Sequence, residues 1–150
     1  MIINGAALVA VRPVEPMPLS KQRSYGVSWG LTEAGIDVRL DQNVTLHPLR
    51  RFVLASTLER FDMPDDLCGF VMGKSTWARR GVNVQATLIE PGWRGHLTLE
   101  IHLQSNRLIR IPRGAGIAAV LFAQLAEAAT YEGHYQDQRR GPVPAIMERG

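Results

Sequence analysis

The stretch Leu97-Thr98-Leu99-Glu100-Ile101-His102-Leu103 alternates apolar and polar residues without a break. This period of two is typical of a β-strand with one face in the core, because successive side chains of a strand point to opposite faces. The polar face of the expected strand carries Thr98, Glu100 and His102. A carboxylate at this place is either exposed to solvent or lines a cleft, and the sequence pattern leaves both readings open.

Segments of similar character flank this strand along the chain. Short runs rich in Val, Ile, Leu and Thr are separated by many of the 14 Gly and nine Pro residues, as in all-β proteins. We expect strands over residues 38–46, 52–58 and 117–125, one helical turn over 75–80, and a second short helix near 125–129. The expected fold is therefore all-β, with one domain over residues 1–150 and at most two short helices.

Composition is that of an ordinary folded protein, with 45% hydrophobic residues and a formal net charge of +3. Because basic residues are scattered among acidic ones along the chain, we expect no nucleic-acid partner. No apolar run approaches the ~20 residues of a membrane helix, so we expect a cytoplasmic protein without a membrane partner. Cys68 is the single cysteine and the four histidines lack metal-ligand spacing, which excludes a disulfide framework and a zinc site of the usual pattern.

The turn that begins at Gly73 combines a cation, Lys74, with the hydroxyls of Ser75 and Thr76. Backbone N–H groups at such a turn can bind one anion together with these side chains. The segment resembles the end of a P-loop, but the residue five positions earlier is Cys68 and not glycine, so that motif is excluded. A capped turn between two strands is the alternative reading.

Four blocks of the sequence resemble the dCTP deaminases, a family within the trimeric dUTPase superfamily. The blocks are Ser-Tyr-Gly at 24–26 with Ala-Gly-Ile-Asp-Val-Arg at 34–39, Gly-Lys-Ser-Thr-Trp-Ala-Arg at 73–79, Thr-Leu-Ile-Glu-Pro-Gly-Trp-Arg-Gly-His-Leu-Thr-Leu-Glu at 87–100, and Tyr-Gln-Asp-Gln-Arg at 135–139. The resemblance runs from about residue 24 to 146. It implies a distorted jelly-roll or β-barrel subunit of a homotrimer, with active sites between subunits.

The same resemblance implies hydrolysis of dCTP to dUTP and ammonia, in which Glu100 assists the attack of water without zinc. Ser75 and Arg79 would position the water and the carboxylate. Magnesium is expected on the triphosphate and not on protein ligands. The resemblance implies contacts to the nucleotide for Lys74, Ser75, Thr76, Thr87, Glu90, Tyr131, His134 and Gln138.

Residues 131–150 invite two readings. The resemblance implies a C-terminal lid over the nucleotide. The composition of the segment, with few apolar residues, predicts a tail that a ligand or a neighbouring subunit would have to order. Typical family members also carry an N-terminal helix and an insertion between the Asp37 block and Leu46, and we expect this chain to lack both.

Two other functions stay open. A dUTPase would use the carboxylate of Glu90 to activate water toward the α-phosphate, with magnesium as Lewis acid, and would release dUMP and pyrophosphate. A non-catalytic nucleotide-binding protein would keep the fold without turnover. Glu100 favours the deaminase. Burial of a carboxylate between Leu99 and Ile101 costs free energy, and without a role in proton transfer that cost would serve no function. A bifunctional enzyme would carry dCTP on to dUMP.

Overall fold

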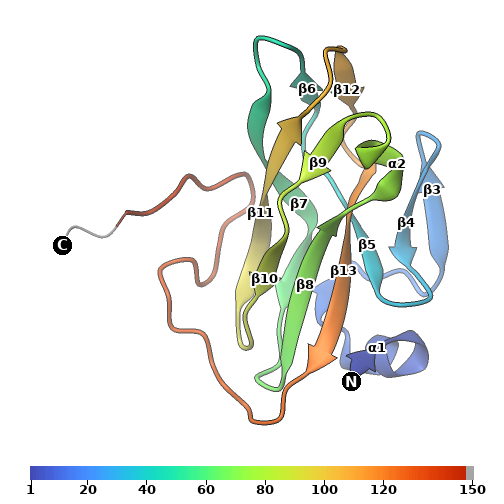
Figure 1. Cartoon of the computed structure of the whole chain (residues 1–150). Helices are drawn as coiled ribbons and strands as arrows, with labels where there is room; N and C mark the ends of the chain where they lie inside the picture. Colours follow the sequence, from blue (N-terminus) through green and yellow to red (C-terminus); the bar gives the residue numbers. More distant parts are fainter. Residues whose placement is uncertain (148–150) are drawn as a thin grey trace.

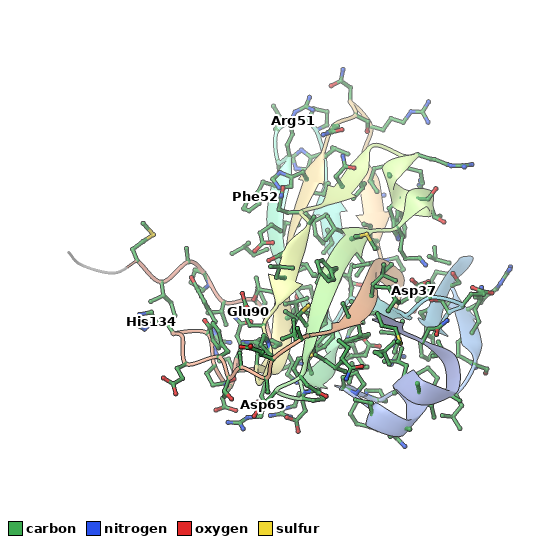
Figure 2. All side chains as sticks on the ribbon, turned by 60° about the horizontal axis from the view of Figure 1, so that its bottom comes forward. Asp37, Arg51, Phe52, Asp65, Glu90 and His134 are labelled. Carbon is green, nitrogen blue, oxygen red and sulfur yellow. The ribbon has the colours of Figure 1, made fainter. Side chains whose placement is uncertain are left out.

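The alternating stretch lies within β11 (Arg94–Leu103), a central strand of the computed structural model, which describes residues 1–147 (Figure 1). On one side β11 pairs with β7 (Phe52–Asp62), and on the other with β9 (Val82–Val84). A short strand, β2 (Val14–Glu15), completes this four-stranded sheet at the far edge of β7. In Figure 2, Phe52 at the start of β7 lies well away from Asp65, which belongs to the turn that follows β7.

A larger sheet packs against the first one, and all pairings between named strands are antiparallel, which confirms the all-β prediction. Its strands, in spatial order, are β10 (Thr87–Ile89), β8 (Leu67–Gly73), β13 (Gly116–Gln124), β5 (Ile36–Arg39), β4 (Val27–Leu31) and β3 (Lys21–Ser24). β1 (Ile2–Ile3) also pairs with β13. β12 (Ile109–Ile111) and β6 (Val44–Leu46) form a separate two-stranded ribbon.

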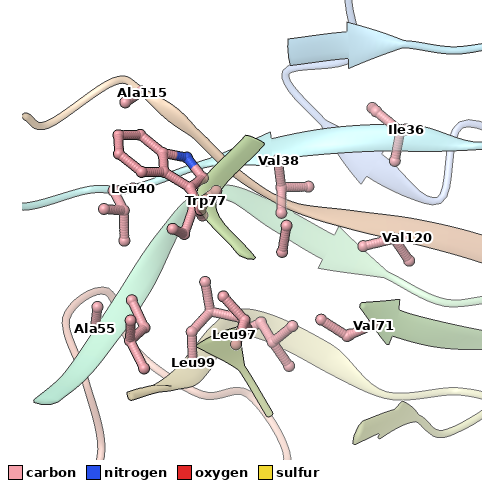
Figure 3. Packing of buried hydrophobic residues seen from close by; sticks show 14 of the residues in the cluster. Ile36, Val38, Leu40, Ala55, Val71, Trp77, Leu97, Leu99, Ala115 and Val120 are labelled. Atoms are coloured by element: carbon pink, nitrogen blue, oxygen red, sulfur yellow. The ribbon is translucent and has the colours of Figure 1, made fainter. Parts of the chain in front are cut away.

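The core fills the space between the two sheets (Figure 3). Leu99 and Ile101 of β11 are fully buried there, and Val71 and Val120 reach it from the opposite sheet. Trp77 closes one end of the core, where its indole N–H donates to the carbonyl of Gly116 at 2.7 Å. Because the odd-numbered residues of β11 face this core, the even-numbered residues point to the other face of the sheet.

Three of the four expected strand ranges are confirmed by β7, β11 and β13. The range 38–46 is wrong as a single strand, because the chain leaves the larger sheet after β5 and crosses to the other one. Leu40 forms a bridge with Thr57 of β7, and the Asp41 N–H donates to the carbonyl of Ser56 at 2.9 Å. The crossing strand therefore ends early, and β6 begins only at Val44.

The expected helical turn is confirmed as α2 (Ser75–Ala78), but the helix expected near 125–129 is absent. There the N–H groups of Leu125 and Ala129 donate to the carbonyls of Asp66 and Asp65, so the segment bonds to the β7–β8 turn instead of to itself.

The expected lack of an N-terminal helix is also wrong. The segment Gly-Ala-Ala-Leu-Val-Ala-Val forms α1 (Gly5–Val11), in which Ala and Leu favour a helix and Leu8 is fully buried. In the described residues, neither helix is long and apolar enough to cross a membrane.

Candidate active site

A cavity of about 480 Å³ lies on the even-numbered face of β11. Its walls come from β7, β10, β11, and the segment of residues 131–147, which we call the C-terminal strap. Five residues named from the sequence line it, namely Thr87, Glu90, Glu100, Tyr131 and Gln138. Thr98, which the alternation places on the same face as Glu100, lines it too, and sequence reasoning named no site role for several further lining residues, namely Phe52, Leu54, Leu88, Trp93, Tyr135 and Val143.

Glu100 points into this cavity and is half-buried. Its backbone is fixed on both sides, because Glu100 lies opposite Leu54 of β7 and its carbonyl accepts the N–H of Gln85 at 2.9 Å. Thr98 lies on the same face of β11, as the period of two predicts, and its hydroxyl accepts the N–H of Val143 at 3.0 Å. The structure thus resolves the question that the sequence left open, since the face with Glu100 lines a cavity.

Glu90 stands at the end of β10, where the chain turns into β11. The turn is closed by the N–H of Trp93, which donates to the Glu90 carbonyl at 3.2 Å. The indole N–H of Trp93 then donates to the carbonyl of Tyr135 at 2.6 Å, which ties the strap to the rim of the cavity. Two carboxylates, those of Glu90 and Glu100, therefore share one cavity with aromatic walls.

The described lining of this cavity contains no Lys, Arg or His. Its other polar side-chain groups are hydroxyls, the amide of Gln138 and the indole N–H of Trp93, which is bonded to Tyr135. Such a cavity can bind a neutral base and a sugar and can move protons through its carboxylates. A triphosphate placed there would need cations from other parts of the protein.

The α2 turn supplies cations and hydroxyls but lies outside this lining. Buried Trp77 anchors the turn, while Ser75, Thr76 and Arg79 are exposed. Within the described part of the chain, the side chains of these three exposed residues have no hydrogen-bond partner. They are therefore available to a ligand or to another subunit.

Lys74 is already engaged by its own chain. Its Nζ donates to a carboxylate oxygen of Asp37 and, at 3.2 Å, to the hydroxyl of Ser28. The Lys74 and Asp37 side chains are only 9% and 8% exposed. Asp37 lies on the opposite side of the molecule from Glu90 in the view of Figure 2, so Lys74 does not reach the cavity of its own chain.

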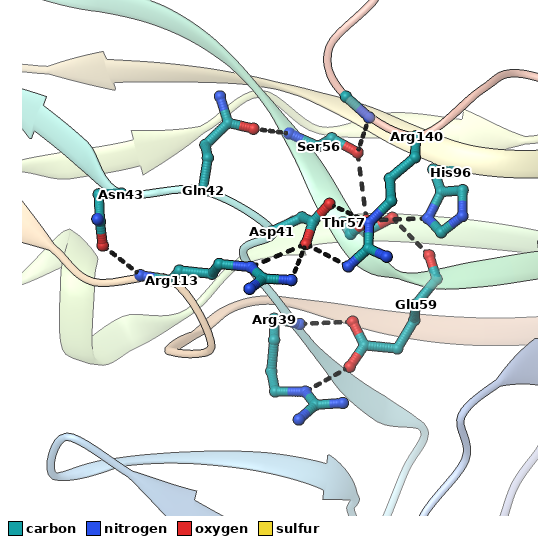
Figure 4. A network of polar contacts seen from close by, with 11 residues as sticks. Arg39, Asp41, Gln42, Asn43, Ser56, Thr57, Glu59, His96, Arg113 and Arg140 are labelled. Carbon is teal, nitrogen blue, oxygen red and sulfur yellow. Dashed lines mark hydrogen bonds and ion pairs between the residues drawn. The ribbon is translucent and has the colours of Figure 1, made fainter.

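The C-terminal strap does not behave as the unordered tail that its composition predicts. It runs beside β11, where Gln138 forms a parallel bridge with Gly95. Further along, Arg140 forms an ion pair with Asp41 (Figure 4). His134 belongs to the strap but is not among the described lining residues, and residues 148–150 of the expected lid lie outside the described part of the chain.

A buried ion pair, Arg39–Glu59, joins the two sheets (Figure 4). Glu59 of β7 accepts the backbone N–H of Arg39 at 2.8 Å and its Nε at 2.7 Å. Burial raises the pKa of Glu59, and the hydrogen bonds and charge of Arg39 oppose that rise. The guanidinium of Arg39 also stacks 3.7 Å from the ring centre of Trp29, so the pair fixes β5 against β7.

Known proteins share both the sequence and the fold of this chain. The family model described as dCTP deaminase-like matches residues 28–125. A dCTP deaminase of Campylobacter jejuni subsp. doylei is 40% identical over 116 residues, which make up 74% of this chain and 62% of that protein. The chain thus matches about three-fifths of the length of this curated relative.

Solved structures show the same fold. A 2'-deoxycytidine 5'-triphosphate deaminase from Agrobacterium tumefaciens superposes with a TM-score of 0.65 at 15% identity, over 83% of this chain and 48% of that one. A dUTPase of Staphylococcus bacteriophage 80alpha superposes with a TM-score of 0.56 at 16% identity, over 81% of this chain and 94% of that one. These likenesses confirm the expected dUTPase-like β fold.

Proposed function

Because this chain belongs to the dCTP deaminase-like family, we propose that it converts dCTP to dUTP and releases ammonia. One observation carries the proposal, namely the side chain of Glu100 in an aromatic-walled cavity next to a second carboxylate. Glu100 is half-buried in that cavity, where its carboxylate can meet a bound base, and proton transfer to such a base is chemistry that a carboxylate supplies.

In the proposed reaction, Glu100 accepts a proton from the water that attacks C4 of the cytosine ring. Glu100 passes that proton to the ring nitrogen N3, then takes the second proton from the hydroxyl now on C4 and delivers it to the amine. The C4–N bond breaks, ammonia leaves, and C4 keeps the water oxygen as a carbonyl. Thr98 and Leu54 lie beside Glu100 on the sheet and line the same cavity, so a base bound there would meet Glu100 from one side.

The rest of the cavity would bind the sugar and the base. Glu90, at the turn after β10, would accept a hydrogen bond from the 3'-hydroxyl of the deoxyribose, and Thr87 lies on the same strand. Tyr131 and Gln138 would cover the nucleotide from the strap. Magnesium would enter with the triphosphate, whose oxygens are ligands of the kind that this ion prefers. Among the described residues, the lining offers two carboxylates but neither His nor Cys, a donor set that does not favour zinc.

We propose a homotrimer in which the α2 turn of one subunit completes the cavity of the next. The charges support this arrangement, since the described cavity holds carboxylates without a cation, whereas the turn presents the exposed groups of Ser75, Thr76 and Arg79. Arg79 would align the carboxylate of the neighbouring Glu100, and Ser75 would hold the attacking water. An apolar row leads from the cavity wall across the sheet, because Leu88 pairs with Phe70 and their side chains are 53% and 40% exposed. A second copy would cover this row.

A dUTPase reading retains support from Glu90, which lies in the same cavity as Glu100. In that reading Glu90 would activate water toward the α-phosphate, and an enzyme that uses both carboxylates would take dCTP to dUMP. The two readings assign the essential step to different side chains, so a pair of matched substitutions separates them.

The test compares Glu100→Gln with Glu90→Gln, each assayed with dCTP and with dUTP in the presence of magnesium, for ammonia and for pyrophosphate. We expect Glu100→Gln to lower ammonia release by about 10²–10⁴-fold, because an amide cannot accept the water proton. Glu90→Gln should mainly raise KM for dCTP. Near-normal ammonia release from Glu100→Gln would remove Glu100 from the mechanism, and pyrophosphate from dUTP without ammonia from dCTP would select the dUTPase.

A further inference from the structure

The C-terminal strap crosses the cavity and makes several contacts with its own chain, among them the Trp93–Tyr135 hydrogen bond and the Arg94–Asp137 ion pair. Two further contacts fasten the stretch from Gln138 to Arg140. At the first, the Gln138 N–H donates to the carbonyl of Arg94 at 3.3 Å, and the Gln138 carbonyl accepts the N–H of His96 at 2.9 Å. At the second, the guanidinium of Arg140 donates to both carboxylate oxygens of Asp41, from Nε at 2.5 Å and from Nη2 at 2.7 Å. The first fastening is a backbone bridge, and the second is an ion pair (Figure 4).

Residues directly after Arg140 form part of the cavity wall. The N–H of Gly141 donates to the hydroxyl of Ser56 at 3.3 Å, and the N–H of Val143 donates to the hydroxyl of Thr98 at 3.0 Å. Val143 and Thr98 both line the cavity. The position of Arg140 therefore sets where this wall stands relative to Glu100.

Little apolar surface holds the end of the strap in place. Residues 141–143 are half-buried and residues 144–147 are exposed. A segment with few buried apolar contacts opens locally at a small cost in free energy, so its polar contacts decide whether it stays closed. Of the polar contacts that residues 139–143 make with the barrel in the described part of the chain, the Arg140 ion pair is the only charged one.

Asp41 is a fixed acceptor, and Arg140 is the movable partner. The Asp41 side chain is 9% exposed, whereas that of Arg140 is 55% exposed. The N–H of Asp41 donates to the carbonyl of Ser56, which holds its backbone against β7. A second arginine, Arg113, donates to Oδ1 of Asp41 from the turn before β13 and belongs to the barrel and not to the strap.

We propose that Asp41 and Arg140 form a latch that holds the strap closed over the cavity of its own chain. A ligand then enters or leaves the cavity only after Arg140 releases Asp41. Asp41 is a positioning residue in this scheme, since it acts on the cavity through the strap. The latch itself is independent of the reaction, and only its effect on kinetics rests on the proposed function.

The chain offers a matched pair of variants for the test. Arg140→Ala and Arg113→Ala each remove one guanidinium from the same carboxylate, but only the first releases the strap. Amide hydrogen exchange on the full-length protein reports the strap through the N–H groups of Gly141 and Val143. We expect exchange there to become about tenfold faster in Arg140→Ala, as the loss of a charge-assisted pair predicts, and less than about threefold faster in Arg113→Ala. Arg140→Lys keeps the positive charge but loses the planar guanidinium that donates two hydrogen bonds at once. It should recover part of the protection of these two amides against exchange.

Kinetic measurements add a readout that a purely structural role would not change. With dCTP as substrate, Arg140→Ala should raise KM several-fold and leave kcat within about threefold, because the strap forms a wall and not the reacting group. Unchanged exchange in Arg140→Ala, or equal effects of the two arginine variants, would overturn the latch. Absence of ammonia from the unmodified protein would overturn the proposed function and leave the exchange result intact.

Discussion

The Arg39–Glu59 and Arg140–Asp41 pairs each join an arginine to a carboxylate through two hydrogen bonds. Their surroundings differ. The side chains of Arg39 and Glu59 are 15% and 1% exposed, and the pair connects two strands of the barrel. Arg140 is more than half exposed and connects the barrel to the strap.

This difference separates the stability of the fold from access to the cavity. A buried charge that loses its partner stays out of water, so the whole fold is destabilised. An exposed arginine that loses its partner is solvated at once, so only the local segment is released. We therefore expect the barrel pair to control unfolding and the strap pair to control opening.

Glu59→Gln should produce the largest change in stability. The substitution leaves the guanidinium of Arg39 largely buried without its countercharge, and we expect the free energy of unfolding to fall by about 3–5 kcal/mol. Chemical denaturation of the purified protein measures this value. Glu15→Gln is the matched control, because it breaks the exposed Arg12–Glu15 pair and should cost at most about 0.5 kcal/mol. Equal losses in the two variants would show that burial does not distinguish these pairs.

Lys74→Ala tests whether Lys74, next to the α2 turn, stabilises the barrel or binds the ligand. Among the residues that the structure describes, removal of its ammonium leaves the buried carboxylate of Asp37 with Ser28 as its one side-chain partner, so we expect a loss of about 2–4 kcal/mol in unfolding free energy. The double variant with Asp37→Asn should recover much of this loss in a double-mutant cycle.

The same two variants sharpen the role of Lys74 in binding. If its ammonium also contacts phosphate after assembly, the triphosphate KM stays raised in the double variant although stability returns. A KM that returns together with stability would make Lys74 a purely structural residue.

Alternation along β11 was sufficient to predict the strand, its buried face and the shared face of Thr98 and Glu100, because a period of two is a local property of the backbone. The turn at Ser75 could also be predicted from a local signal, namely a glycine followed by a short helical segment. In both cases the signal lies within about ten residues of sequence.

The strap could not be placed in this way. Its contacts join residues far apart in the chain, such as Arg140 with Asp41, and no pattern within residues 131–147 marks the partner. The break after β5 has the same origin, since Leu40 pairs with Thr57 across the barrel. From composition alone, a polar segment with few apolar residues is predicted to be a disordered tail, because its tertiary partners are not visible in its own sequence.

Gly95→Ala should detach the strap at its backbone bridge. A Cβ at this position would lie 2.6 Å from the nitrogen and 2.7 Å from the oxygen of Gln138, and the φ of +141° is unfavourable for an L side chain. We expect faster hydrogen exchange at His96 and along the strap. Gly26→Ala is the control, because Gly26 also has a positive φ, +76°, but a Cβ there would meet nothing within 4 Å. Strap exchange that stays slow in Gly95→Ala would show that the backbone bridge is not needed to hold the segment.

Acidification should give the smallest and most gradual effect. Hydrogen bonds from Arg140 lower the pKa of Asp41 below its ordinary value, and those from Arg94 do the same for Asp137. For a carboxyl whose pKa is lowered on folding, the stabilisation is complete above the ordinary pKa, near pH 4, and is lost as the pH falls through the lowered value. Strap exchange, corrected for the intrinsic pH dependence of amides, should thus stay constant from neutral pH to about pH 5 and rise only below pH 4. In Asp41→Asn the strap should already exchange quickly at neutral pH, with a weaker acid transition because the Arg94–Asp137 pair still contributes. An acid transition of unchanged size in that variant would assign the loosening to other carboxyls and would separate the latch from the pH response.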